Sequence, residues 1–183
     1  MYAASVTKQM VAALVAQQVL GGQLDPDDRV VDLLPALPAW AEPIQVRHLI
    51  HHTSGLPATA RVLAAVGLDD QQHLDNSLVL QALSNLSHPD APPGRAFVYS
   101  NIGYVVLAQA LSALTGTAVP ILAEKSLFQP LGMTDSRLAA DKQVTLPDAT
   151  TQPRTVGDGG LGPAPPTCWS GWTPSTITAW TPI

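Results

Sequence analysis

Hydrophobic positions recur at helical spacing over the first twenty residues of the chain. The apolar side chains that form this stripe are Val6, Met10, Val11, Leu14, Val15 and Val19. Spacings of three and four residues place such side chains on one face of an α-helix. The pattern therefore predicts a helix over 5–20, with Ser5 as its N-cap and Gly21-Gly22 as its end.

The same criterion predicts further helices along the chain. They are expected over 45–52, 58–86 with a break near 67–70, 101–114, and 119–128. Three prolines mark a loop over 87–94, and the residues 96–98 that follow are expected to be extended. The first 160 residues thus predict a helix-rich domain.

Composition and charge narrow the class of protein. With 46% hydrophobic and 13% charged residues, the chain is expected to be globular. A net charge of −5 without a basic stripe excludes nucleic acid as a predicted partner. The single cysteine, Cys168, excludes an internal disulfide and a multi-cysteine zinc site. No apolar stretch is long enough for a membrane segment and no signal peptide is recognised, so the compartment stays unassigned.

The character of the sequence changes after Gly160. Five prolines, three tryptophans and the only cysteine follow with neither helical nor strand periodicity. We therefore expect two parts: a domain over 1–160 and an aberrant, disordered tail over 161–183.

Ser5 and Lys8 form an S-x-x-K motif at the start of the first predicted helix. Residues three apart share a helix face, so the lysine amine can reach the serine hydroxyl. A lysine without its proton can then activate the serine as a nucleophile. The alternative is an N-capping serine followed by a surface lysine.

Tyr99-Ser100-Asn101 forms a Y-x-N motif between the extended stretch and a helix. A phenol near a protonated lysine has a lowered pKa, which makes Tyr99 a candidate general base. The Asn101 amide is a candidate contact for the lysine or for a substrate carbonyl. The alternative is a buried tyrosine followed by Asn101 as an ordinary N-cap.

His48 and His52 are four residues apart and can share a helix face. No carboxylate or third ligand accompanies them, so no metal site is predicted, and the imidazoles are expected to satisfy local backbone groups. A metal hydrolase built on this pair remains a distant alternative.

Five segments in this order resemble the β-lactamase-related serine hydrolases. The segments are Y-A-A-S-V-T-K-Q-M, G-Q-L-D-P-D-D-R-V, H-T-S-G-L, Y-S-N-I-G-Y and P-L-G-M-T-D-S. That family includes class C β-lactamases, penicillin-binding D-alanyl-D-alanine carboxypeptidases and esterases. The resemblance covers Tyr2 to about Gly160.

The resemblance implies acyl transfer from an amide, lactam or ester to a serine, followed by hydrolysis. Ser5 would be the nucleophile, Lys8 its proton acceptor, Tyr99 the partner base, and Asn101 a substrate or lysine contact. The expected partner is a small-molecule or peptide substrate with a reactive carbonyl, and no cofactor is expected. The residues leave the choice among lactam, D-peptide and ester substrates open. The segments H-T-S-G-L and Gly157-Asp158-Gly159-Gly160 are expected to be structural.

The resemblance also implies an α/β fold of the β-lactamase/transpeptidase type, of which this chain would hold mostly the helical part with little sheet. We expect truncation at both ends, because the strands before Ser5 and a late K-T-G or H-x-G motif are not found. With GC-rich codon choices, the tail read in the adjacent frame gives an amphipathic helix, so a frameshift near Leu161 is expected; an unusual natural terminus is the alternative. Activity is expected to be impaired or absent, and the rival hypothesis is a non-catalytic remnant or ligand-binding module.

Overall fold

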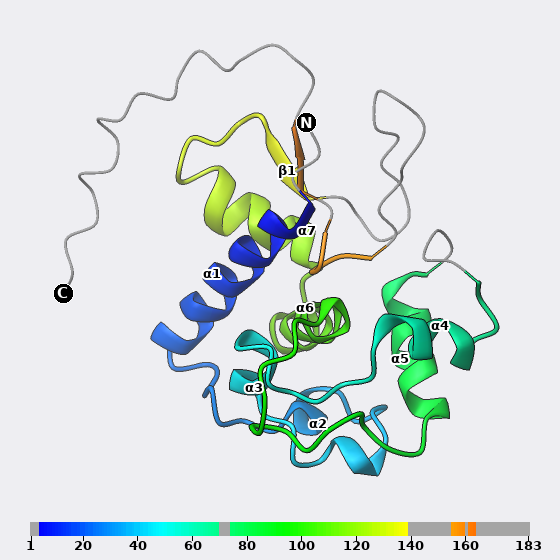
Figure 1. Cartoon of the computed structure of the whole chain (residues 1–183). Helices are drawn as coiled ribbons and strands as arrows, with labels where there is room; N and C mark the ends of the chain where they lie inside the picture. The colour runs from blue at the N-terminus through cyan, green and yellow to red at the C-terminus, as the bar shows by residue number, and fades with distance from the viewer. Residues whose placement is uncertain (1–3, 70–73, 139–154, 160, 164–183) are drawn as a thin grey trace.

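The computed structural model describes residues 4–69, 74–138, 155–159 and 161–163, and most of them are helical (Figure 1). In chain order the elements are η1 (Ala4–Val6), α1 (Thr7–Leu20), α2 (Val30–Leu33), η2 (Ala39–Ala41), α3 (Val46–Ile50), α4 (Thr59–Ala65), α5 (Asn76–Asn85), α6 (Asn101–Thr115), α7 (Val119–Ala123), the π-helix η4 (Glu124–Phe128), β1 (Ser136–Leu138) and β2 (Leu161–Pro163). The prediction of a mostly helical chain with little sheet is confirmed.

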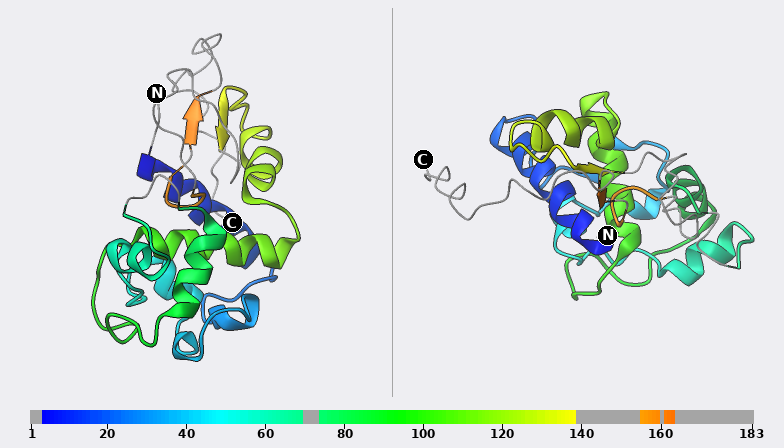
Figure 2. Two further views of the ribbon diagram at one scale, coloured as in Figure 1. Left: turned by 90° about the vertical axis from the view of Figure 1, so that its right-hand side faces the viewer. Right: turned by 90° about the horizontal axis from the view of Figure 1, so that it is seen from above.

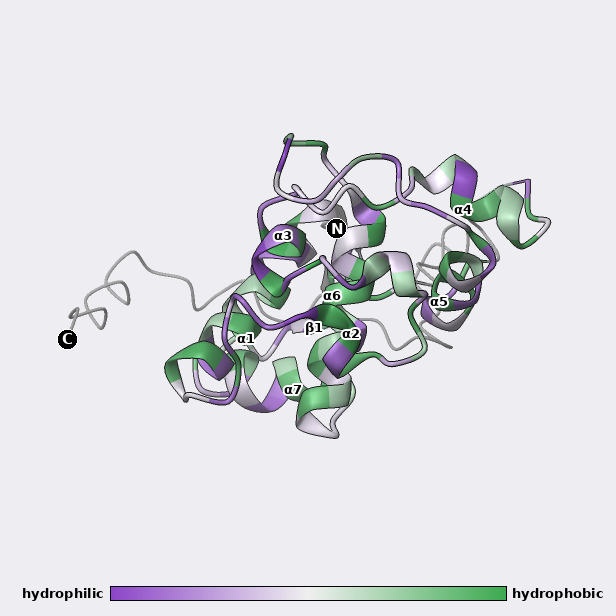
Figure 3. Cartoon of the chain, turned by 90° about the horizontal axis from the view of Figure 1, so that it is seen from below, coloured by the Kyte–Doolittle hydropathy of each residue, from purple (hydrophilic) through white to green (hydrophobic). Residues whose placement is uncertain are grey.

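Helix α6 is the centre of the fold. It packs against α1, α2, α3, α5 and α7, and hydrophobic positions dominate it in the view coloured by hydropathy (Figure 3). Nearly every residue from Ile102 to Leu111 is buried, so this helix is apolar on all its faces, as expected for a helix enclosed by others. Its N-cap is Ser100, whose hydroxyl accepts from Gly103 N at 3.0 Å, and its C-cap is Gly116, which has a φ of 63°.

The first helix differs at its beginning from the prediction. Ser5 lies in the 3-10 turn η1, and Val6 is the N-cap of α1 without a side-chain capping bond. The prediction of Ser5 as the N-cap is therefore wrong: the helical path already starts before Ser5, which leaves its hydroxyl free for other partners. The helix ends at Leu20 before Gly21-Gly22, as predicted.

Two short antiparallel strands stand at one end of the molecule, with β1 beside α7 and η4 (Figure 2). Leu138 of β1 lies opposite Leu161 of β2, and both side chains are buried. Leu161 N also donates to Thr7 Oγ1 at 2.9 Å, which ties β2 to the first turn of α1. The segment predicted to be an aberrant tail therefore starts with an ordered strand, and its remainder, 164–183, lies outside the described residues.

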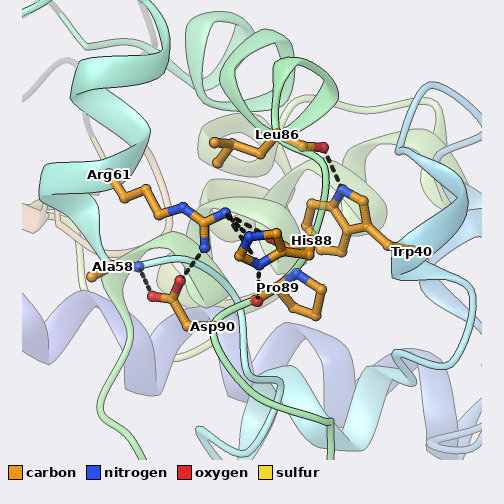
Figure 4. A network of polar contacts seen from close by, with 7 residues as sticks. All are labelled: Trp40, Ala58, Arg61, Leu86, His88, Pro89 and Asp90. Atoms are coloured by element: carbon orange, nitrogen blue, oxygen red, sulfur yellow. Dashed lines mark hydrogen bonds and ion pairs between the residues drawn. The ribbon is translucent and has the colours of Figure 1, made fainter.

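A polar network anchors the loop that leads from α5 toward the Y-x-N motif (Figure 4). Asp90 accepts from Ala58 N at 2.8 Å and pairs with Arg61 of α4, while Arg61 also donates to His88 O. Trp40 Nε1 donates to Leu86 O at 2.6 Å on the other side. The loop is thereby fixed to both flanking parts of the helical body.

No single helix in the described part of the chain has the length and hydropathy needed to cross a membrane. Only the pair Asn101–Thr115 and Val119–Phe128, bent by 75°, meets that criterion when the two are taken together.

Candidate active site

The start of α1 places Ser5 and Lys8 on one side of the helix. Lys8 Nζ donates to Ser5 Oγ at 3.3 Å, and Lys8 is only 6% exposed. The S-x-x-K spacing thus brings the amine to the hydroxyl, and the alternative of a surface lysine is excluded.

Lys8 has two further acceptors, and each lies in a distant segment of the chain. Its ammonium donates to Asn101 Oδ1 at 2.9 Å and to the backbone oxygen of Asp158 at 2.9 Å. Together with Ser5 Oγ these acceptors match the three hydrogens of a charged ammonium group. The site therefore holds a buried positive charge one helical turn from the candidate nucleophile.

Tyr99 completes the cluster from the segment before α6. Its hydroxyl donates to Ser5 Oγ at 2.7 Å, and Lys8 Nζ lies 4.9 Å from the centre of its ring. Burial raises the pKa of Tyr99, but the hydrogen bonding and charge of Lys8 and the bond to Ser5 outweigh it, so the pKa is lowered overall. The phenolate of Tyr99 therefore forms at a lower pH than that of an ordinary tyrosine.

The Y-x-N motif differs from its alternative interpretation in two respects, the first being that Tyr99 is 51% exposed and not buried. Ser100, not Asn101, is the N-cap of α6, and Asn101 is the first helical residue. Because Asn101 has no capping role, its side-chain oxygen is available to Lys8. The structure thus brings all four predicted site residues, Ser5, Lys8, Tyr99 and Asn101, into one cluster.

The two histidines of the H-x-x-x-H pair have separate backbone partners. His48 Nδ1 accepts from Gln45 N at 3.1 Å, and His52 Nδ1 accepts from Ser100 N at 3.1 Å. Within the described ranges no group of three His, Cys, Asp or Glu side chains is placed to hold a metal ion.

The contact of Lys8 with Asp158 was not expected from the sequence, which assigned Gly157 to Gly160 no chemical role. Gly157 has a φ of 118°, and a Cβ there would overlap the backbone of Tyr104 in α6. This close approach brings the Asp158 carbonyl to Lys8. The glycine-rich run was the available signal, since such runs allow backbone to pack tightly against other backbone.

Comparison with known proteins gives this cluster a context. The family model described as Beta-lactamase matches residues 1–179. The chain belongs to the beta-lactamase family. Its relatives bear the names penicillin-binding protein, D-alanyl-D-alanine carboxypeptidase, D-aminopeptidase and esterase.

The chain is similar to penicillin-binding protein 4 of Amycolatopsis lactamdurans. The two are 29% identical over 173 residues, which cover 90% of this chain and 42% of the relative. Esterase EstB of Burkholderia gladioli is 31% identical over 181 residues, covering 88% of this chain and 45% of the relative. The chain thus spans less than half the length of either relative.

Solved structures in the family share the fold. The crystal structure of a penicillin binding protein from Bacillus halodurans superposes with a TM-score of 0.71 at 26% identity, covering 88% of this chain and 54% of that one. The predicted β-lactamase/transpeptidase-like fold class is confirmed.

Proposed function

We propose that this chain carries the nucleophile of a serine hydrolase, with Ser5 attacking the carbonyl carbon of an amide, lactam or ester. The observation that supports it is the pair of contacts on Ser5 Oγ, from Lys8 Nζ at 3.3 Å and from Tyr99 Oη at 2.7 Å. An activated serine needs a proton acceptor within hydrogen-bond reach and a nearby positive charge.

In this proposal Tyr99 accepts the proton of Ser5. All three hydrogens of the Lys8 ammonium have acceptors, so Lys8 acts as a fixed charge that favours the phenolate and the developing alkoxide. In the phenolate state the same 2.7 Å separation lets Ser5 donate to Tyr99. This differs from the role of proton acceptor that the resemblance implies for Lys8.

The reaction then proceeds by acyl transfer. The Ser5 oxygen bonds to the substrate carbonyl carbon as its proton passes to Tyr99, and the tetrahedral intermediate expels an amine or alkoxide that takes up that proton. Water subsequently attacks the acyl-enzyme, gives its proton to Tyr99, and releases a carboxylic acid as Ser5 is reprotonated.

A covalent probe tests the proposal without requiring a known substrate. The chain is incubated with a fluorophosphonate and, separately, with benzylpenicillin, and is analysed by intact and peptide mass spectrometry. We expect one adduct per chain, located on Ser5 and absent from Ser5→Ala. A folded chain that gives no adduct at high reagent would instead favour a non-catalytic remnant or ligand-binding module.

The pH dependence of labelling is a further expected outcome. The phenolate of Tyr99 is the proton acceptor, so the labelling rate is highest above the Tyr99 pKa and is lost as pH falls through it. Because that pKa is lowered, the midpoint is expected below the ordinary tyrosine value of about 10. Rates measured from about pH 6 to about pH 11 decide this, and a midpoint at or above the ordinary value contradicts the role of Tyr99.

A further inference from the structure

His52 has an unusual backbone conformation for its residue type. Its φ is 56°, and it is the one non-glycine residue with positive φ in the described part of the chain. L-residues with a side chain rarely adopt this left-handed region, and Asn, Asp and His are the usual exceptions. The conformation follows directly on the end of α3 and turns the chain toward the segment that precedes α6.

This turn lets His52 bond to both neighbours of Tyr99. The backbone oxygen of His52 accepts from Val98 N at 2.8 Å, and its Nδ1 accepts from Ser100 N at 3.1 Å. The two bonds hold the N–H groups of the residues immediately before and after Tyr99. The backbone position of the phenol is thus set by a single residue of a different segment.

The imidazole ring of His52 also contacts the ring of Tyr99. The centres of these two rings are 4.7 Å apart. The centre of the imidazole also lies 5.1 Å from the ring centre of Tyr104 and 5.7 Å from that of Phe97, which it meets edge to face. Tyr104 is itself fixed, because its hydroxyl donates to Ile50 O at 3.1 Å. Tyr99 is 51% exposed, so core packing alone does not fix its ring.

The acceptor role of His52 requires an unprotonated Nδ1. Burial and, after it, the charge of Lys8 lower the pKa of His52, which keeps the imidazole neutral near pH 7. The charge of Lys8 thereby also favours the neutral form of His52, whose Nδ1 accepts from Ser100 N.

We propose that His52 is a positioning residue that holds the Tyr99 hydroxyl against Ser5, through its bonds to the backbone on both sides of Tyr99 and through ring contact. This inference rests on the proposed function, in which Tyr99 accepts the proton of Ser5. It assigns to the H-T-S-G-L segment a part in the chemistry beyond loop structure.

Two substitutions separate the contributions of His52. His52→Asn retains a side-chain acceptor for Ser100 N and suits a left-handed backbone, but removes the ring. His52→Phe retains a flat ring and removes the acceptor; because phenylalanine also strains the left-handed backbone, its free energy of unfolding is measured beside its reactivity. His48→Asn is the matched control, because His48 is the neighbouring imidazole that accepts a backbone N–H away from Tyr99.

The first readout is the rate of fluorophosphonate labelling of Ser5 as a function of pH. In His52→Phe we expect a fall on the order of 10–100-fold at neutral pH, since misplacement by about 1 Å has effects of this size. We also expect the midpoint to move up, because Tyr99 leaves the ammonium that lowers its pKa. His52→Asn should lose less, and His48→Asn should match the wild-type chain.

The second readout does not depend on the reactivity of Ser5. The ionisation of Tyr99 is followed by tyrosinate absorbance, as the difference between each chain and the same chain carrying Tyr99→Phe. An upward shift in His52→Phe without any adduct in the wild-type chain would overturn the proposed function and keep the positioning role. Unchanged titration and labelling in folded His52→Phe and His52→Asn would overturn the positioning role alone. If the labelling rate falls equally in His52→Phe and His52→Asn, the bond from Ser100 N to His52 Nδ1 has no part in positioning Tyr99.

Discussion

Replacing Tyr99 with phenylalanine is expected to slow the labelling of Ser5 by a fluorophosphonate by about 10²–10⁴-fold, the usual contribution of a positioned acid–base group. The substitution removes the one oxygen that lies 2.7 Å from Ser5 Oγ and leaves the ring against His52. Lys8 remains, but its three hydrogens are engaged, so it is a poor substitute as proton acceptor. The rate constant for adduct formation by intact mass is the measurement.

Tyr104→Phe is the matched control for this substitution. Tyr104 contacts the same imidazole and lies under the same ammonium, with 5.7 Å from Lys8 Nζ to its ring centre. Its hydroxyl, however, donates to Ile50 O and not to Ser5. We expect Tyr104→Phe to label within a few-fold of the wild-type rate. Similar rates for Tyr99→Phe and the control would remove Tyr99 from the mechanism.

Replacing Gly55 with alanine is expected to destabilise the fold by about 2–5 kcal/mol. A methyl group there would overlap the carbonyl of Ala91, and the backbone has a φ of 67°. The left-handed backbone costs about 1–2 kcal/mol for a residue with a Cβ, and overpacking adds about 1–3 kcal/mol. Gly55 O also accepts from Asp90 N at 2.9 Å, so a displaced Gly55 breaks the pairing of two loops.

Gly67→Ala separates the two causes. Gly67 has nearly the same φ, 70°, but a Cβ there meets nothing within 4 Å. We expect it to lose only the backbone contribution of about 1–2 kcal/mol. Free energies of unfolding from urea titrations, followed by fluorescence, provide the comparison. Equal losses at the two positions would show that the loop around Ala91 yields to the methyl group.

Much of the helical body could be predicted because its signals are local. The uninterrupted apolar run after Asn101 predicts a buried helix, and α6 is that helix. The glycine pair after Leu20 likewise predicts the end of α1. The strands β1 and β2 could not be predicted, since three residues are too few to show an alternating pattern.

The candidate site was predictable where its members are side chains and not where they are backbone. S-x-x-K and Y-x-N name four side chains by spacing, and the structure clusters them. The carbonyl of Asp158 does not stand out by itself, because every residue carries one, and the glycines beside it are the one local signal of a close backbone approach. The two bonds from His52 to the residues before and after Tyr99 depend on a left-handed backbone at a non-glycine residue. Residue identity alone does not signal that conformation.

The acceptors of Lys8 lie at positions 5, 101 and 158. One side chain therefore joins three segments that are far apart in the sequence. Domains generally fold as units during synthesis. Asp158 is synthesised 150 residues after Lys8, so the partners of the ammonium are complete only once Asp158 has left the ribosome. The contacts of a side chain at position 8 therefore depend on chain that is synthesised much later.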